Sequence, residues 1–354
     1  MSFSWAKAEA GNWSDKSHWT TAPVATGQPF YSLNFNKPGT YITTLDLNDN
    51  FSFNQLNLAG NVTFAGTNSL SPTANGPLLP QINQNSMNTV TFAAPLKLTA
   101  MTTMGGMDSG SVTFTGVLSG PGGLTKNSLG GLNITNVTNT YSGGTIINNG
   151  TISLGWQANH ALGTGPLTLN QSGTLNMNRI FTSTPLILNG GTIIPDGGWG
   201  NNFSGPVTLN SNTTINADDN IGFSGNISGA GGFTKTGNST MNLTGTNSFT
   251  GASTIKAGTL QCTNPDALGT GSLDIREGAK VALNYTGTRT IAALTFKAGA
   301  AQAPGTYGST ASPATNQNDT YFSGTGTVTI LSATTRALPA AGSPSAQRSP
   351  PRSR

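Results

Sequence analysis

Acidic and basic side chains come closest together at Asp274, Arg276 and Glu277. Asp274 and Arg276 are two residues apart, so on a β-strand they lie on the same face. Clustered acids with a basic neighbour are what a polysaccharide lyase or hydrolase needs for general acid–base chemistry. The other acids are scattered along the chain and rarely have a basic partner nearby. We therefore interpret this cluster as a surface ion pair and predict a non-enzymatic protein without catalytic residues.

A second group of acids would bind a cation if its members converged. Asp218 and Asp219 are adjacent, and Asp196 lies upstream of them. Adjacent strand residues point to opposite faces, so the pair converges only in a turn, where Asp-Asp-Asn is ordinary turn sequence. The nonapeptide G-G-x-G-x-D-x-U-x, which binds Ca²⁺ in repeat proteins, is absent from the sequence. We predict no metal site and no cofactor.

Nucleophiles and proton-transfer groups are few. The two histidines are His18 and His160, and His160 aligns with Asp266 in a second copy of the same unit, so no Ser–His–Asp arrangement can be based on it. The single cysteine, Cys262, aligns with Leu154 and is predicted to be a buried, small apolar residue. These residue types therefore indicate structural roles.

One aromatic position recurs and could bind glycans if it were exposed. Tyr141 in the first copy of the unit returns as Phe249 in the second. The position tolerates loss of the hydroxyl, which favours an aromatic stack inside the fold over an exposed sugar-binding ring.

All these residues belong to, or surround, a unit that occurs twice. The segment GGLTK (Gly122–Lys126) returns as GGFTK (Gly231–Lys235), and HALGTGPLTL returns as DALGTGSLDI. The copies lie near 111–178 and 221–284, and their offset drifts from 109 to 106 residues. We interpret the glycines and the Thr-Lys pair of the unit as the places where the chain rounds corners.

Composition excludes several classes of protein. Charged residues make up 8% of the chain, against roughly 25% in typical globular domains, and Gly, Asn, Thr and Ser replace them. Of the 16 basic residues, four arginines lie in the last nineteen residues, which leaves 12 basic against 12 acidic residues in the body. A neutral body gives no basic face for nucleic acid. The sequence contains no run of 18 apolar residues, so it predicts no transmembrane segment. The first residues lack the pattern of a signal peptide.

Short alternating strands separated by Gly and Asn turns predict an all-β fold. Like elements recur every 18–25 residues, which is the length of one coil of a β-helix. We predict a single-stranded, right-handed parallel β-helix over 23–331, with roughly 13 coils and a length on the order of 60 Å, and with ladders of Asn, Thr and Ser between coils. Segments 66–88 and 298–319 are predicted to be surface loops, and 332–354 a disordered Pro/Ser/Arg-rich tail.

The first 22 residues contain three of the five tryptophans, Trp5, Trp13 and Trp19. We predict that residues 1–22 form a compact cap, because the open end of a strand stack offers unpaired backbone groups to other chains. An exposed aromatic platform for sugars is the alternative.

The unit also resembles a known family. The pattern S-G-x-G-G-[LF]-T-K, then N-x-[YF]-[ST]-G, then G-T-[LI] is similar to the autotransporter-associated β-strand repeat, or passenger-associated transport repeat. The three parts of the pattern stand at Ser119–Lys126, Asn139–Gly143 and Gly150–Ile152, and again at Ser228–Lys235, Asn247–Gly251 and Gly258–Leu260.

The resemblance implies a right-handed β-helix that is secreted or lies at the cell surface and acts as a structural or adhesive passenger. Two alternatives stay open: a filament-forming subunit, and a β-helix protein that binds or degrades polysaccharide. Self-association through the solenoid ends and contact with a surface glycan or a host ligand are the partners that this interpretation allows.

Overall fold

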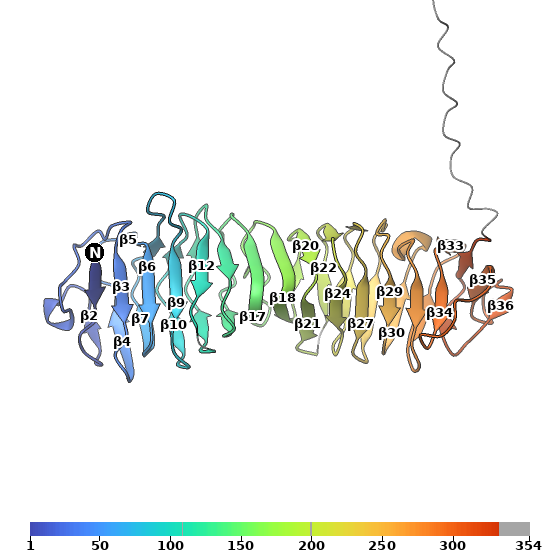
Figure 1. The fold of residues 1–354 in the computed structure, drawn as a ribbon, viewed down its shortest axis with the longest axis horizontal. Coiled ribbons are helices and arrows are strands. Elements are labelled where there is room, and N and C mark those ends of the chain that lie inside the picture. Colours follow the sequence, from blue (N-terminus) through green and yellow to red (C-terminus); the bar gives the residue numbers. More distant parts are fainter. Residues whose placement is uncertain (108, 199, 333–354) are drawn as a thin grey trace, which may run out of the picture.

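The computed structural model describes residues 1–107, 109–198 and 200–332. The chain forms a long β-solenoid of about 13 turns with parallel strands and almost no helix (Figure 1). The described part contains two short 3-10 helices, η1 (Lys16–His18) and η2 (Pro265–Ala267). The turns run over three faces, which we call the first, second and third face in chain order, and most turns have a strand on each face. The all-β parallel solenoid predicted from the sequence is confirmed.

The strands of each face pair in parallel with those of the turns before and after. The first face contains β1 (Ser2–Ser4), β3 (Ser32–Phe35), β6 (Gln55–Leu58), β9 (Gln81–Gln84), β12 (Thr102–Gly105), β15 (Leu124–Lys126), the first parts of β17 (Thr145–Leu154) and β18 (Leu167–Asn178), β20 (Leu186–Asn189), β23 (Val207–Leu209) and β26 (Ile227–Ser228).

The second face is the longest. It contains β2 (Gly11–Asn12), β4 (Thr40–Thr44), β7 (Asn61–Ala65), β10 (Val90–Phe92), β13 (Val112–Phe114), β16 (Leu132–Ile134), the second parts of β17 and β18, β21 (Thr192–Asp196), β24 (Thr213–Asn216), β27 (Phe233–Thr236), β29 (Ser253–Ile255), β31 (Leu273–Ile275) and β34 (Leu294–Phe296).

The third face is interrupted. Its first sheet has β5 (Phe51–Phe53), β8 (Leu70–Pro72), β11 (Leu96–Lys97) and β14 (Leu118–Ser119), and its second has β19 (Phe181–Thr182), β22 (Asn201–Phe203), β25 (Ile221–Phe223), β28 (Thr240–Leu243), β30 (Thr259–Cys262), β32 (Lys280–Leu283) and β37 (Phe322–Ser323). Between β14 and β19, two turns cross this face without an assigned strand.

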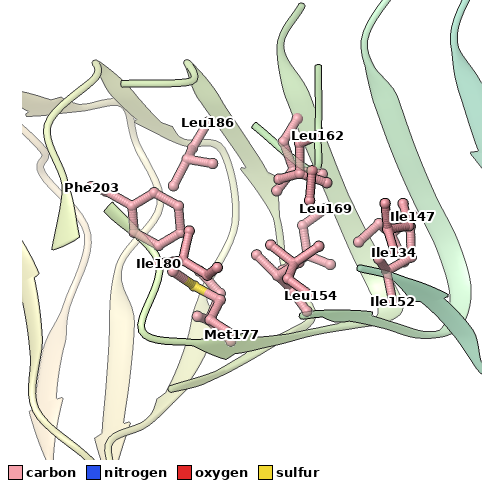
Figure 2. Packing of buried hydrophobic residues seen from close by; sticks show 14 of the residues in the cluster. Ile134, Ile147, Ile152, Leu154, Leu162, Leu169, Met177, Ile180, Leu186 and Phe203 are labelled. Atoms are coloured by element: carbon pink, nitrogen blue, oxygen red, sulfur yellow. The ribbon is translucent and has the colours of Figure 1, made fainter. Parts of the chain in front are cut away.

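The core fills the inside of the coil. Along each strand buried and partly exposed residues alternate, because successive strand side chains point to opposite faces of the sheet. Inward residues of successive turns stack on one another, as Phe64 does on Phe92 with ring centroids 4.7 Å apart. Figure 2 shows the same arrangement further along, where Ile134, Ile152 and Leu154 point into the coil. Apolar contact between neighbouring turns therefore holds the coils together.

Asparagine side chains form a ladder on the outside of the first face. Asn148 donates to Asn127, Asn170 to Asn148, Asn189 to Asn170 and Asn210 to Asn189, with distances of 2.5–2.8 Å. Each amide both donates and accepts, so one residue type per turn satisfies the whole column. The predicted side-chain ladders between coils are confirmed for asparagine.

Both ends of the solenoid are crossed by antiparallel segments. At the first end, Trp19 bridges Trp5 in antiparallel register, and Thr20 N–H donates to the Ser4 carbonyl at 3.0 Å. At the far end, β35 (Gly305–Gly308) runs antiparallel to β38 (Thr327–Ile330), which itself pairs with β33 (Thr288–Ile291). The edge strand of this small sheet, β36 (Asn316–Gln317), pairs with β35 (Figure 1). The direction of pairing thus changes where the stack of parallel strands ends.

Two predicted loops contain strands, which corrects the sequence interpretation. Segment 66–88 includes β8 and β9, and segment 298–319 includes β35 and β36. A strand of three residues needs little intrinsic propensity when a neighbouring turn already offers a complete row of hydrogen-bonding partners, so Pro- and Asn-rich sequence did not prevent pairing. The predicted tail, 332–354, lies outside the described residues except for Ser332.

Candidate functional site

The residues singled out for chemistry take structural positions. Asp274 and Arg276 form an ion pair, with Asp274 Oδ2 2.5 Å from Arg276 Nε. Asp274 Oδ1 also accepts a hydrogen bond from Thr295 Oγ1 at 2.8 Å, in the next turn. Glu277 pairs with Lys297 at 3.1 Å. Asp274 and Arg276 therefore form a surface ion pair, as predicted, and Asp274 and Glu277 also bond to the next turn.

The aspartates of the predicted turn do not converge on a common point. Asp219 accepts hydrogen bonds from the backbone N–H groups of Gly200 and Asn220, at 3.0 and 2.7 Å. Asp218 accepts from the side-chain amide of Asn216, and Asp196 accepts from Gly197 N–H. Carboxylates that accept backbone N–H bonds in this way are ordinary turn chemistry.

The aromatic and thiol groups of the repeat lie inside the coil. Tyr141 and Phe249 are fully buried, so the aromatic-interior prediction is confirmed and the exposed sugar-binding alternative is wrong for both. The Tyr141 hydroxyl bonds to Thr145 Oγ1 at 2.7 Å, and burial raises its pKa far above the usual value. Cys262 is buried as predicted, and burial raises the pKa of its thiol to about 12, which makes it unreactive.

The tryptophans near the first end are also buried. Trp5 and Trp13 are each 1% exposed and Trp19 is 5% exposed, and Trp13 stands edge-on to Trp19 with centroids 5.3 Å apart. They are therefore interior anchors, and the alternative of an aromatic sugar platform at this end is wrong for all three.

The two copies of the repeat face different sides of the rod. Strand β15, which carries GGLTK, lies on the first face, whereas β27, which carries GGFTK, lies on the second. On the first face, β26 lies five turns after β15. The chain then rounds one corner and forms β27 on the second face. Equivalent strands of the copies are therefore displaced by one face around the axis, and the copies are successive segments of one continuous coil.

Each copy buries a lysine, which the sequence interpretation missed. Lys126 and Lys235 were predicted to lie at corners, but both end the inward row of a strand and are 1% and 0% exposed. Lys235 Nζ donates to the carbonyls of Gly237 and Ala257 at 2.9 and 2.8 Å, and Lys126 Nζ donates to the Ser128 carbonyl and hydroxyl. Burial lowers the pKa of both ammonium groups to about 8. A recurrent lysine at an alternating inward position was the signal that could have revealed these lysines.

The glycines of the repeat do mark corners, as predicted. Gly150 and Gly258 are equivalent and have φ of 68° and 62°, in the left-handed region that favours glycine. A Cβ at Gly150 would also lie 2.8 Å from Lys126 Nζ. The corner glycine therefore makes room for the buried ammonium group in the first copy.

A buried asparagine in each copy joins three turns. Asn139 accepts a hydrogen bond from Leu118 N–H at 2.8 Å in the preceding turn and donates to the Ala161 carbonyl at 3.0 Å in the following turn. Asn247 does the same with Ile227 N–H and the Ala267 carbonyl, at 2.7 and 2.5 Å. These asparagines replace the missing strand hydrogen bonds where the backbone departs from the ladder.

Replacing Asn247 by alanine is expected to lower the free energy of unfolding by about 2–4 kcal/mol, because one buried N–H and one buried carbonyl lose their partners. The measurement is urea unfolding followed by circular dichroism. The matched control is Asn226→Ala, which removes an exposed amide that bonds to Thr246 N–H at 3.0 Å. Equal losses in the two variants would contradict the role of Asn247 as a buried clamp.

The outer surface of the third face carries a groove, which we call the third-face groove. Its volume is about 400 Å³. Phe181, 49% exposed, stands at one end and also borders a second hollow that contains His160. The lining residues of the groove are Phe181, Gly200, Asn201, Asn202, Asn220, Ile221, Gly222, Asn242, Thr244, Gln261 and Thr263. Sequence reasoning missed this surface, because its residues come from five different turns.

Comparisons with known proteins agree with the repeats. A family model described as passenger-associated-transport-repeat matches residues 124–154 and 233–261, each of which includes one buried lysine, one buried asparagine and one corner glycine. No curated protein and no solved structure matches the chain. Two segments of the chain thus match the passenger-associated transport repeat and lie within a β-solenoid, an arrangement that fits an autotransporter passenger-like repeat protein. In the part of the chain that the structure describes, no helix has the length and apolar character to cross a membrane.

Proposed function

We propose that this protein is a non-enzymatic, secreted or surface-displayed rod that acts as a structural spacer and as an adhesive. The observation that carries the proposal is the placement of two passenger repeats inside one uninterrupted solenoid. The polar groups of these repeats, Lys126, Lys235, Asn139 and Asn247, are all buried. Lys235, Asn139 and Asn247 bond to neighbouring turns, and Lys126 bonds within its own corner. These polar groups stabilise the rod from the inside, so the outer surface is free to make contacts.

Two further observations support a rod without catalysis. The acids of the Asp274 cluster are already bonded to Arg276, Thr295 and Lys297, and a general acid or base needs a free position beside its substrate. The third-face groove, the surface hollow that spans the most turns among those described, is lined by no acid.

The proposal is tested by incubating the purified protein with neutral and acidic polysaccharides and assaying reducing ends and unsaturated products. No product is expected, either from the natural chain or from Asp274→Asn. The substitution should cost only about 1 kcal/mol of stability, because the ion pair is partly exposed. Product formation that disappears in Asp274→Asn would instead establish the β-helix enzyme.

The filament alternative is addressed by the ends of the rod. Trp19 and Thr20 at one end and β35 at the other run antiparallel across the stack, which supports a monomeric rod. An end that is covered in this way offers fewer unpaired backbone groups to a second copy.

A further inference from the structure

The outward side chains of the third face differ from those of the first face in their hydrogen bonding. On the first face the asparagines bond to one another in an unbroken ladder. On the third face, Asn242 and Gln261 occupy adjacent outward positions of the register, and neither side-chain amide has a partner among the described residues. Two neighbouring amides therefore present both donors and acceptors at the surface.

The register also explains the shape of the groove. The outward row runs Phe181, Asn202, Gly222, Asn242, Gln261 on consecutive strands. Strands are spaced about 4.8 Å apart, so the row advances by that distance at each residue. Gly222 has no side chain where its neighbours carry amides, and the Asn202 amide reaches across this position to donate to Ser224 Oγ at 3.0 Å. The row is thus an aromatic ring, an amide that is bonded within the protein, a glycine without a side chain, and two free amides along one line.

The chemistry of this lining selects a class of ligand. None of the groove residues is charged. A carboxylate, sulfate or phosphate would lose its hydration there without gaining an opposite charge, which is costly. An amide both donates and accepts hydrogen bonds, as a hydroxyl does, and an exposed phenyl ring offers an apolar face.

We infer that the third-face groove binds a neutral glycan that runs along the rod. Phe181 packs against the C–H face of one sugar ring, and the glycan passes over Gly222. Asn242 and Gln261 form hydrogen bonds with hydroxyl groups of the sugar rings. The inference deepens the adhesive part of the proposed function and rests on it. The spacer part does not depend on the groove.

The test uses the full chain and three neutral probes, namely maltohexaose, cellohexaose and mannohexaose, with an oligogalacturonate as the charged comparison. Isothermal titration calorimetry should detect binding of at least one neutral probe and none of the oligogalacturonate. Phe181→Ala should weaken that binding about fivefold to tenfold, because alanine removes the apolar ring face against which the sugar packs. The Asn242→Ala/Gln261→Ala double variant should weaken it similarly.

Gly222→Thr keeps the inference falsifiable if Phe181→Ala disturbs the strand. Gly222 does not have a left-handed φ, and a Cβ there meets only the end of the Asn202 side chain, at 2.5 Å, as a close contact. Threonine therefore fills the groove at this position by displacing the end of the Asn202 side chain, and glycan binding should fall while the protein stays folded. Leu129→Ala, at a residue that is 69% exposed and outside the groove, is the control and should bind as the natural chain does.

Two outcomes overturn the inference. One is that none of the neutral probes binds while the protein is folded and monomeric. The other is that binding occurs but survives both Phe181→Ala and Gly222→Thr, which would place the ligand elsewhere. Both outcomes leave a rod without catalysis intact, whereas product release from a polysaccharide would refute the proposed function itself.

Discussion

Replacing Lys235 by glutamate is expected to destabilise the rod by more than about 4 kcal/mol or to prevent its folding. The ammonium group of Lys235 is fully buried and donates to the carbonyls of Gly237 and Ala257. A carboxylate in its place would be buried without donors and would face those same carbonyl oxygens. Lys235→Met keeps the volume and loses only the donors, which should cost about 1–3 kcal/mol.

The measurement for these variants is urea unfolding at neutral pH. Lys256→Glu is the matched control, because it makes the same charge change at an exposed lysine of the next corner and should alter stability by no more than about 0.5 kcal/mol. If Lys235→Glu were as mild as Lys256→Glu, the ammonium group would not be structural.

The lowered pKa of both buried lysines makes this effect depend on pH. Burial lowers the pKa of Lys126 and Lys235 to about 8 from the ordinary 10.5. Between these values the unfolded chain binds more protons than the folded chain, so stability rises with pH across that window; below about pH 8 the full cost of burying the charge is present. The natural chain should therefore gain on the order of 3 kcal/mol per lysine relative to Lys126→Met/Lys235→Met as the pH is raised through the whole window. Parallel pH profiles for the two proteins would show that the lysines do not titrate in this way.

Removing the far end of the rod is expected to convert a monomer into concentration-dependent assemblies. A chain that ends after Lys297 lacks β35, β36, β37 and β38. The edges of β32 and β33 then carry unpaired N–H and carbonyl groups, a template on which a second copy can pair. Light scattering after size-exclusion chromatography should show the intact chain as a monomer and the shortened chain as oligomers, with filaments visible by electron microscopy.

The control for this prediction removes only residues 333–354 and should remain monomeric. Deletion of residues 1–22 tests the other end in the same way, because it removes the Trp5–Trp19 bridge. If the chain that ends after Lys297 and the chain without residues 1–22 both stayed monomeric and unfolded cooperatively, the antiparallel segments would not be what prevents end-to-end pairing.

Much of the architecture follows from the sequence alone. Strand side chains alternate between inside and outside, so aligned apolar residues of two copies identify inward positions with little ambiguity. This reasoning correctly placed Cys262 in the interior from its alignment with Leu154, and Tyr141 from its replacement by Phe249. Turn chemistry is equally local, which is why the roles of Asp218 and Asp219 could be predicted.

The same local rule fails at the repeat lysines. The alternation of side chains along the strand places Lys126 and Lys235 at inward positions. A charged side chain, however, normally indicates the surface. Their carbonyl partners lie at a corner and, for Lys235, also in the following turn, so the compensation for burial is visible only when the turns are stacked.

The tertiary structure alone decided how the repeats and the outer surface are arranged around the axis. The offset of 106–109 residues between the two copies fixes their relative rotation around the axis only when the length of each turn is known. That length depends on corner conformations such as the one at Gly150. The third-face groove has the same origin: Phe181, Gly222, Asn242 and Gln261 are far apart in sequence and become one row because parallel pairing brings consecutive turns into register. The residues that could do chemistry by their spacing in the sequence hold the coil together instead. The surface best suited to a ligand is assembled from single residues of separate turns, which only the register brings together.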